Sequence, residues 1–512
     1  MESNFLNNIG KGKPFHYSIE AIPGRGNNKK ELDEIFELAR KASEYNKIHS
    51  FALTDSPGGN PRLSPDNIGR ELLKTGLDII IHLSCKDRNR NDLESRAYQL
   101  NSMGLNNILA LTGDYNIEGY GGIPKPVFDY DSVLLTKLLK DMNRGLEVPG
   151  RKPGTMDKLP PTEFTVGVAV SPFKQQEAEV MNQYMKLIRK IRAGADYVVT
   201  QLGYNSRKFD ELIRFMRENN LNVPILGYIY VPLRGVAQMM NKNLLPGSVV
   251  TDEMMAKIEK ESESPDKGKS ARINRAAKQI AILRGLGYSG AHIGGFMLKF
   301  EQIVEIIEKS EEYARNWQEY VKETTFEMPN EWYYYKLDPK TGLNTGEWSW
   351  NESDRGNHKA PLNYKIFRFL HWLMFTPGTA GFNINRLACR FLDKPERKFI
   401  LDCVYFMEKS IKALTNECKE CGDCSLPEMA FLCPESQCGK FLRNGQCGGS
   451  YKGMCEVYPE KPCVWVKIYN RLKVYNEQIQ IQDNPLIARN WKLYGTSSWM
   501  NFYLGRDHVK AK

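Results

Sequence analysis

The stretch Asn107-Ile-Leu-Ala-Leu-Thr-Gly113-Asp114 decides the fold class of this sequence. It is an apolar strand that runs into a Thr-Gly-Asp turn, and an amphipathic helical pattern follows at 132–144. The same strand-then-helix unit recurs along the chain. The predicted strands are 17–22, 50–55, 78–83, 107–114, 164–170, 197–201, 224–230 and 291–296, and the predicted helices include 30–45, 92–103, 132–144, 175–193, 209–219, 270–286 and 299–311.

Eight strands, each followed by a helical pattern, over about 300 residues predict a parallel (β/α)8 (TIM) barrel of the α/β class. A doubly wound sheet is the alternative, but no G-x-G-x-x-G fingerprint follows the early strands. We expect a smaller cysteine-rich, metal-binding domain after the barrel. The predicted division is 1–320 for the barrel, 321–385 for an aromatic linker and interface helix, and 386–512 for the cysteine-rich domain.

Polar residues stand at or near the carboxyl ends of the predicted strands, which form the catalytic face of such barrels. One alone is usually structural, but six at one rim favour a site. They are Glu20, Thr54, His82, Asp114, Gln201 and His292. Glu20 lies among apolar neighbours, either as a paired structural acid or, near a barrel mouth, with a raised pKa suited to proton donation.

Eight of the eleven cysteines fall within residues 418–463, and the first three follow a C-x2-C-x2-C spacing. This run and a later Cys-Pro pair resemble the ligand order of ferredoxin-type iron–sulfur clusters. Eight thiolates suit two [4Fe–4S] clusters, one cluster and a zinc, or zinc alone. A disulfide scaffold is typical of small secreted chains instead. The candidate ligands are Cys418, Cys421, Cys424, Cys433, Cys438, Cys447, Cys455 and Cys463.

Composition narrows the function classes. The formal charge of +10 fits an ordinary solvated surface or docking of an anionic partner such as an acidic redox protein. No nucleic-acid-binding module and no apolar run long enough to span a membrane are evident, and the opening residues lack a signal-peptide pattern.

Only three cysteines lie outside the cluster region, which predicts a reducing cytoplasm. Aromatic residues within 328–350, if exposed, predict an oligomer or a larger complex.

Several motifs together resemble the methylenetetrahydrofolate reductase family over about residues 15–310. The C-terminal part, with Asn444-Gly-Gln-Cys447-Gly-Gly-Ser and Cys463-Val-Trp, is similar to a domain that accompanies this reductase in anaerobes and acetogens, usually as a partner subunit. The barrel motifs are Tyr17-Ser-Ile-Glu20-Ala-Ile-Pro, Leu53-Thr54-Asp, His82-Leu-Ser-Cys, Leu111-Thr-Gly113-Asp114 and Ala193-Gly-Ala-Asp-Tyr-Val-Val-Thr-Gln201.

The resemblance implies a flavin-containing barrel and a role for each matching residue. Glu20 matches the family's general acid, Asp114 the acid between flavin and pterin, and Gln201 the pterin-contacting glutamine. The positions that match flavin-lining or phosphate-side residues are Thr54, His82, Gly113 and Lys190.

Departures from the family pattern bear on the cofactor. Thr112 replaces the arginine before Gly-Asp, and Val170, Lys174 and Gln183 replace three residues that contact the adenine half of FAD in some relatives. These losses favour FMN over FAD, with Lys174 pairing with the terminal phosphate.

The implied activity is reduction of 5,10-methylene-tetrahydrofolate to 5-methyl-tetrahydrofolate, or the reverse, in anaerobic one-carbon metabolism such as the Wood–Ljungdahl pathway. Ferredoxin or another redox protein would exchange electrons with the flavin through the iron–sulfur clusters. Three alternatives stay open. The enzyme would use NAD(P)H and hold structural zinc, its carrier would be a pterin such as tetrahydromethanopterin, or the chain would serve as an electron-relay or assembly subunit.

Overall fold

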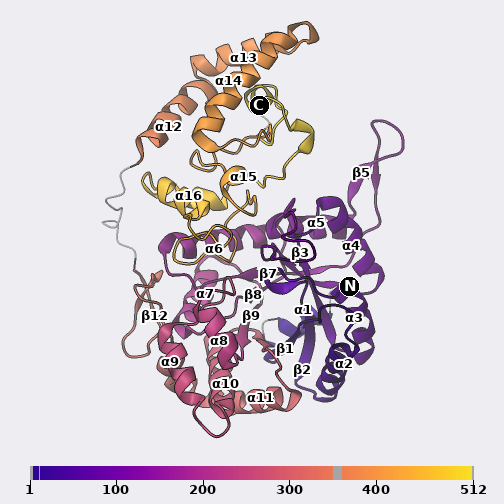
Figure 1. The fold of residues 1–512 in the computed structure, drawn as a ribbon, viewed down its shortest axis with the longest axis vertical. Helices are drawn as coiled ribbons and strands as arrows, with labels where there is room; N and C mark the ends of the chain where they lie inside the picture. The colour runs from indigo at the N-terminus through magenta and orange to yellow at the C-terminus, as the bar shows by residue number, and fades with distance from the viewer. Residues whose placement is uncertain (1–3, 11, 350–359, 510–512) are drawn as a thin grey trace. The chain divides into compact units, whose positions relative to one another are not determined.

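A closed barrel of eight parallel strands forms the first part of the chain (Figure 1), as the strand-then-helix pattern predicts. The computed structural model describes residues 4–10, 12–349 and 360–509. Around the barrel the order is β1 (His16–Ala21), β10 (Gly290–Gly294), β9 (Ile225–Tyr230), β8 (Tyr197–Thr200), β7 (Thr165–Val170), β4 (Asn107–Leu111), β3 (Asp78–Ser84) and β2 (Ile48–Leu53).

Helices cover the outside of the barrel because each turns an apolar stripe toward the strands. Side-chain caps fix where several of them begin. Asp131 accepts backbone N–H bonds at the start of α5 (Ser132–Arg144), and Asn205 accepts one at the start of α7 (Ser206–Glu218). These helices are α2 (Lys29–Glu44), α3 (Pro65–Leu72), α4 (Arg90–Ser102), α5 (Ser132–Arg144), α6 (Glu177–Arg192), α7 (Ser206–Glu218), α8 (Arg234–Asn241), α9 (Asp252–Glu261), α10 (Lys269–Leu286) and α11 (Phe300–Tyr313).

Side chains from alternate strand positions fill the barrel interior, and the short helix α1 (Asn4–Ile9) packs against them. Phe5 and Ile9 of α1 are fully buried, and the Phe5 ring lies 4.9 Å from that of Tyr197. The sequence pattern did not predict this helix. A small hairpin of β5 (Glu147–Pro149) and β6 (Met156–Lys158) is a further element that the pattern missed.

The chain divides into two compact units, at boundaries that differ from the predicted ones. The barrel unit comprises residues 1–350 together with 447–452, and the second unit comprises 351–446 and 453–512. Much of the predicted linker therefore belongs to the barrel unit, whereas its residues 350–359 lie outside the described residues.

Residues 324–349 pack on α7 and include the two-stranded sheet of β11 (Tyr335–Leu337) and β12 (Asn344–Trp348). Their aromatic side chains are largely used in this packing, since Tyr333 and Tyr335 are buried. The Arg207 guanidinium lies 3.5 Å from the centre of the Tyr333 ring and donates to the Asn344 side chain. The predicted association surface is thus mostly an internal contact.

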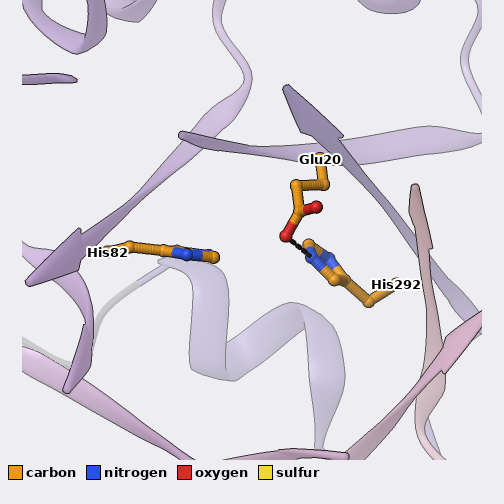
Figure 2. Close-up of side chains that lie close together, drawn as sticks. All are labelled: Glu20, His82 and His292. Carbon is orange, nitrogen blue, oxygen red and sulfur yellow. Dashed lines mark ion pairs between the residues drawn. The ribbon is translucent and has the colours of Figure 1, made fainter. Parts of the chain in front are cut away.

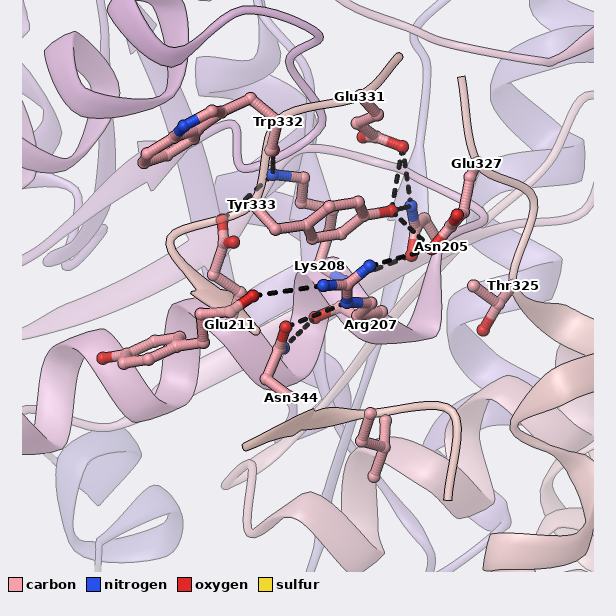
Figure 3. Close-up of polar contacts among 12 residues, drawn as sticks. Asn205, Arg207, Lys208, Glu211, Thr325, Glu327, Glu331, Trp332, Tyr333 and Asn344 are labelled. Atoms are coloured by element: carbon pink, nitrogen blue, oxygen red, sulfur yellow. Dashed lines mark hydrogen bonds and ion pairs between the residues drawn. The ribbon is translucent and has the colours of Figure 1, made fainter. Parts of the chain in front are cut away.

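A buried ion pair anchors this segment, as Figure 3 shows. The side chains of Lys208 and Glu211 on α7 are both fully buried, with Nζ and Oε1 3.0 Å apart. Lys208 also donates to the Trp332 carbonyl at 2.6 Å, and Glu211 accepts from the Tyr334 backbone N–H at 2.6 Å. Because both charges are completely desolvated, each depends on these partners.

The second unit is built mainly from three long helices and a cysteine-rich part with little regular structure (Figure 1). Aromatic rings of Phe375, Phe382, Phe502 and Tyr503 form a small core between its helices. Its helices are α12 (Leu362–Phe375), α13 (Ala380–Leu392), α14 (Lys398–Asn416), α15 (Pro434–Gln437), α16 (Val464–Lys473) and α17 (Ser498–Tyr503).

Replacing Lys208 with methionine is expected to destabilise the barrel unit by about 3–5 kcal/mol, because it leaves the Glu211 carboxylate buried without its ion pair. Lys137→Met is the control, since Lys137 and Asp141 form an exposed pair on α5 whose loss costs less than about 1 kcal/mol. Urea unfolding followed by tryptophan fluorescence measures both variants. Equal unfolding midpoints for the two would show that the buried pair does not anchor the segment.

Candidate active site

Glu20, at the carboxyl end of β1, lies at the centre of the polar groups inside the barrel rim. The Tyr228 hydroxyl on β9 donates to its Oε1, and His292 Nε2 on β10 lies 3.5 Å from its Oε2. Figure 2 shows His82 of β3 facing the same carboxylate, and one ligand-type atom from each of Glu20, His82 and His292 lies within 4.8 Å of the others. The sequence placed all three at one rim, and the structure brings them together.

The pKa of the Glu20 carboxyl is lower than usual, so the raised pKa expected from the sequence is wrong. Burial alone raises this pKa, but the nearby His292 ring and the Tyr228 hydroxyl lower it by more. In turn, burial and the Glu20 charge raise the pKa of Tyr228 well above its usual value. Tyr228 therefore stays protonated and donates to an ionised carboxylate.

His82 is held as a neutral imidazole, since burial lowers its pKa to about 4. Its Nε2 atom and the Thr54 hydroxyl are buried and have no hydrogen-bond partner among the described residues. Buried polar atoms are nearly always satisfied in folded proteins, so two such atoms at one rim indicate a place for a ligand. Both belong to residues that the sequence assigned to the flavin, and they fit that group.

Gly113 and Asp114 form the turn after β4 that the sequence singled out. Gly113 has a φ of +91°, and an added Cβ would lie 3.0 Å from the Lys86 side chain, so only glycine suits the position. Asp114 Oδ2 accepts the Gly58 backbone N–H at 2.6 Å, which joins this turn to the loop after β2.

Gln201, just beyond β8, lies beside two glycines from distant parts of the chain. Its Oε1 accepts the Leu202 backbone N–H at 2.9 Å. A Cβ added to Gly247 would lie 3.2 Å from Gln201 Nε2 and 3.0 Å from the carbonyl oxygen of Gly448. The segment 447–452, which belongs to the barrel unit, therefore reaches the carboxyl rim beside Gln201.

Both lysines that the sequence assigned to the flavin phosphate are buried and bonded to backbone carbonyls. Lys190 Nζ donates to the Ala169 oxygen at 2.6 Å, and burial followed by the charge of Lys186 lowers its pKa to about 7. Lys174 Nζ donates to the Gly448 oxygen at 2.6 Å and the Ser450 oxygen at 2.5 Å. Their role at a flavin phosphate stays a prediction.

In the second unit, the first four candidate cysteine ligands line one small cavity with Lys412 and Arg443. Burial raises the thiol pKa of Cys463, and the nearby Cys438 and Cys455 raise it further, so these three also lie near one another. No disulfide joins any of the eleven cysteines, all of which lie in the described part of the chain. The cavity residues are Cys418, Cys421, Cys424 and Cys433.

The fold and rim place this chain among (β/α)8 barrel proteins with a polar site at the carboxyl ends of the strands. A family model for methylenetetrahydrofolate reductase matches residues 5–311, and a model described as methylene-tetrahydrofolate reductase C terminal matches residues 401–492. The first match covers more than half of the chain. The chain therefore belongs to the methylenetetrahydrofolate reductase family.

Curated relatives match over part of their length. A probable methylenetetrahydrofolate reductase (NADPH) of Caenorhabditis elegans is 26% identical over 223 residues, covering 43% of this chain and 30% of the relative. The 5,10-methylenetetrahydrofolate reductase of Buchnera aphidicola is 25% identical over 162 residues, covering 31% and 47%. This chain thus spans less than half the length of either relative.

A solved structure of an uncharacterized protein from Clostridium thermocellum, described as binding two copies of 5-methyl-5,6,7,8-tetrahydrofolic acid, has a TM-score of 0.42 and 15% identity to this chain. It covers 61% of this chain and 100% of its own.

Sequence reasoning did not connect Tyr228 or His292 with Glu20. Tyr228 lies within a predicted strand, and no local signal marks it as a partner of a residue 208 positions away. His292 stood at the predicted rim, but its contact with Glu20 depends on which strands are neighbours in the closed barrel. The register between neighbouring strands brings these groups together, and the local sequence pattern does not predict that register.

Replacing Tyr228 with phenylalanine is expected to raise the pKa of Glu20, because it removes a hydrogen bond that stabilises the ionised form. Infrared titration of the carboxylate bands measures the shift, with Glu20→Gln identifying the Glu20 signal. Tyr230→Phe is the matched control, since the Tyr230 hydroxyl accepts the Phe296 N–H and makes no hydrogen bond to Glu20. A Glu20 titration at the same pH in wild type and Tyr228→Phe would contradict this assignment.

Proposed function

We propose that this chain interconverts 5,10-methylene-tetrahydrofolate and 5-methyl-tetrahydrofolate with a flavin bound at the barrel rim. The observation that carries the proposal is the largely buried Glu20 carboxylate, held by Tyr228 and His292 and facing the unpartnered His82 Nε2. Family membership and the names of the relatives support the same reaction class.

In the reducing direction, Glu20 donates a proton to the carrier nitrogen that leaves the methylene carbon. The C–N bond of the five-membered ring breaks, its electron pair goes to the protonated nitrogen, and an iminium cation remains. Because the pKa of Glu20 is lowered, the carboxylate takes up a proton before each transfer. The contact between His292 Nδ1 and Ser18 Oγ, at 3.1 Å, fixes the ring that faces this carboxylate.

Asp114 supplies negative charge next to the cationic carbon. The Gly58 N–H holds its carboxylate in place, so little reorganisation is needed when the cation forms. Gln201 contacts the pterin ring. A bound flavin supplies the hydride that completes the reduction.

FMN is the proposed flavin, with FAD as the alternative. Thr54 and His82 would line it, because both carry buried polar atoms without a hydrogen-bond partner among the described residues. Gly113 would line it as well, which is the role that the family resemblance implies. Lys190, buried with a lowered pKa, is the proposed residue on the phosphate side.

The cysteines are proposed to hold two [4Fe–4S] clusters. Four of them line one cavity, which gathers the thiols that a four-cysteine centre requires. The C-x2-C-x2-C spacing of the first three follows the ligand order of ferredoxin-type clusters.

A protein partner is proposed to exchange electrons with these clusters. Large apolar side chains are exposed on α12, α13 and α14, among them Leu362, Leu387, Phe391, Phe399, Phe406 and Leu414. Residues 362–416 also carry nine basic and four acidic side chains, a net +5 that is half of the chain's formal charge. Apolar surface with a basic surround suits an acidic redox protein such as a ferredoxin.

None of the described helices is long and apolar enough to cross a membrane. We place the reaction in a reducing cytoplasm, because eleven cysteines without a disulfide are typical of that compartment. The alternatives are direct use of NAD(P)H with structural zinc, a methanopterin-type carrier, and an electron-relay or assembly subunit.

Anaerobically purified protein is expected to contain about eight irons and one FMN, as two [4Fe–4S] clusters and one flavin require. A photoreduced, acidic two-cluster ferredoxin is expected to bleach the flavin absorbance, and NADH and NADPH serve as comparison donors. Zinc without iron, or rapid bleaching by NAD(P)H and none by ferredoxin, would make the cysteine region structural and overturn the electron route.

A further inference from the structure

The segment Cys447–Lys452 follows the cysteine run in sequence but belongs to the barrel unit by its contacts. It reads Cys-Gly-Gly-Ser-Tyr-Lys and lies against α6 and the loop between β7 and α6. Cys447 is one of the eight candidate cluster ligands. The barrel therefore holds a predicted metal ligand through residues more than 260 positions away in sequence.

Four barrel side chains bind this segment through its backbone and one hydroxyl. Lys174 Nζ donates to the Gly448 and Ser450 oxygens, and Gln183 Nε2 donates to the Cys447 oxygen at 2.8 Å. The Ser450 hydroxyl donates to Glu179 Oε1 at 2.7 Å, and Gln176 donates to the Lys452 oxygen at 3.1 Å.

These contacts are buried, which makes them costly to lose. Lys174 is 2% exposed, and Glu179 is fully buried. A buried ammonium needs strong acceptors, and the two carbonyls of the segment are such partners at 2.5–2.6 Å. Lys174 and Glu179 thus depend on the segment as much as the segment depends on them.

The segment also lies next to the proposed reaction site. The Gly448 oxygen and Gln201 Nε2 both lie close to Gly247. Gly247 has a φ of +82°, which favours glycine, so no side chain separates these two groups. Cys447 is the residue before Gly448, so the contacts that hold the segment also fix where this cysteine stands at the carboxyl rim.

We propose that Lys174, Glu179 and Gln183 are positioning residues that hold Cys447 at the barrel rim for electron transfer between its iron–sulfur cluster and the flavin. This inference rests on the proposed function. Two successive one-electron transfers from the cluster, which the ferredoxin-type donor reduces again, supply the two electrons of the flavin, and solvent supplies the protons. In this assignment Lys174 binds segment 447–452. It does not bind the flavin phosphate, which is the role expected from the sequence.

The test separates two ways of reducing the flavin in the full-length, cluster-loaded protein. Reduced ferredoxin delivers electrons through the clusters, whereas 5-methyl-tetrahydrofolate reduces the flavin directly from the substrate side. In Lys174→Met, flavin and iron content and the methyl-folate half-reaction are expected to match wild type. Flavin bleaching by ferredoxin is expected to slow several-fold, because the rate of electron transfer falls steeply as the distance between cluster and flavin grows.

Three further variants complete the design. Lys174→Arg keeps the charge and is expected to restore much of the ferredoxin rate. Gln183→Leu removes the bond to the Cys447 oxygen, together with a longer bond of 3.4 Å from the Ser171 N–H, and leaves Lys174 in place. It is expected to slow the same half-reaction, so it tests the assignment even where Lys174→Met does not fold. Lys137→Met, an exposed change on α5, is the control and is expected to leave both half-reactions unchanged.

Two results would overturn the inference. Loss of flavin from Lys174→Met with iron retained would assign Lys174 to the flavin phosphate. Unchanged ferredoxin rates in both Lys174→Met and Gln183→Leu would show that the segment needs no anchoring. By contrast, a wild-type flavin that methyl-folate does not reduce would refute the proposed function itself.

Discussion

Parallel pairing between β1 and β10 closes the barrel, and the rest of the site depends on that closure. Its register sets Ser18 opposite His292, so that Glu20, two residues further along β1, comes within 3.5 Å of the His292 ring. Pairing of β10 with β9 sets His292 opposite Tyr228, whose hydroxyl donates to the same carboxylate. The Glu20 carboxylate on β1 is thereby held by side chains of β9 and β10, the last two strands of the barrel in sequence.

Three buried charged side chains of the barrel unit have specific partners, and each arrangement has a consequence. Lys208 and Glu211 join residues 324–349 to α7, and Lys174 joins segment 447–452 to the rim. At Glu20 the partners lower the pKa of a residue that is proposed to donate a proton. Its partners stabilise the ionised form by more than burial opposes it, so the proposed donor is an anion that takes up a proton during turnover.

The barrel and most of its rim were predictable from sequence, because buried parallel strands are apolar runs that end in polar turns. Thr54, His82 and Asp114 lie at such ends, and the family motifs named their roles. Contacts between distant residues were not predictable. The raised pKa for Glu20 was wrong because its partners lie on β9 and β10, and the partners of Lys174 lie on a segment 274 residues away. Helix α1 was missed because six residues are too few to show a helical periodicity. Its stability comes from packing against side chains inside the barrel, which the local sequence does not reveal.

The most direct test of the central claim is substrate turnover by Glu20→Gln, a variant that keeps the shape of the side chain and removes the acid. Iron and flavin content and flavin reduction by ferredoxin are expected to equal those of wild type. Reduction of 5,10-methylene-tetrahydrofolate is expected to fall by about 10²- to 10⁴-fold, the usual contribution of a general acid. Turnover at the wild-type rate would remove Glu20 from the chemistry and favour a relay or assembly role for the barrel.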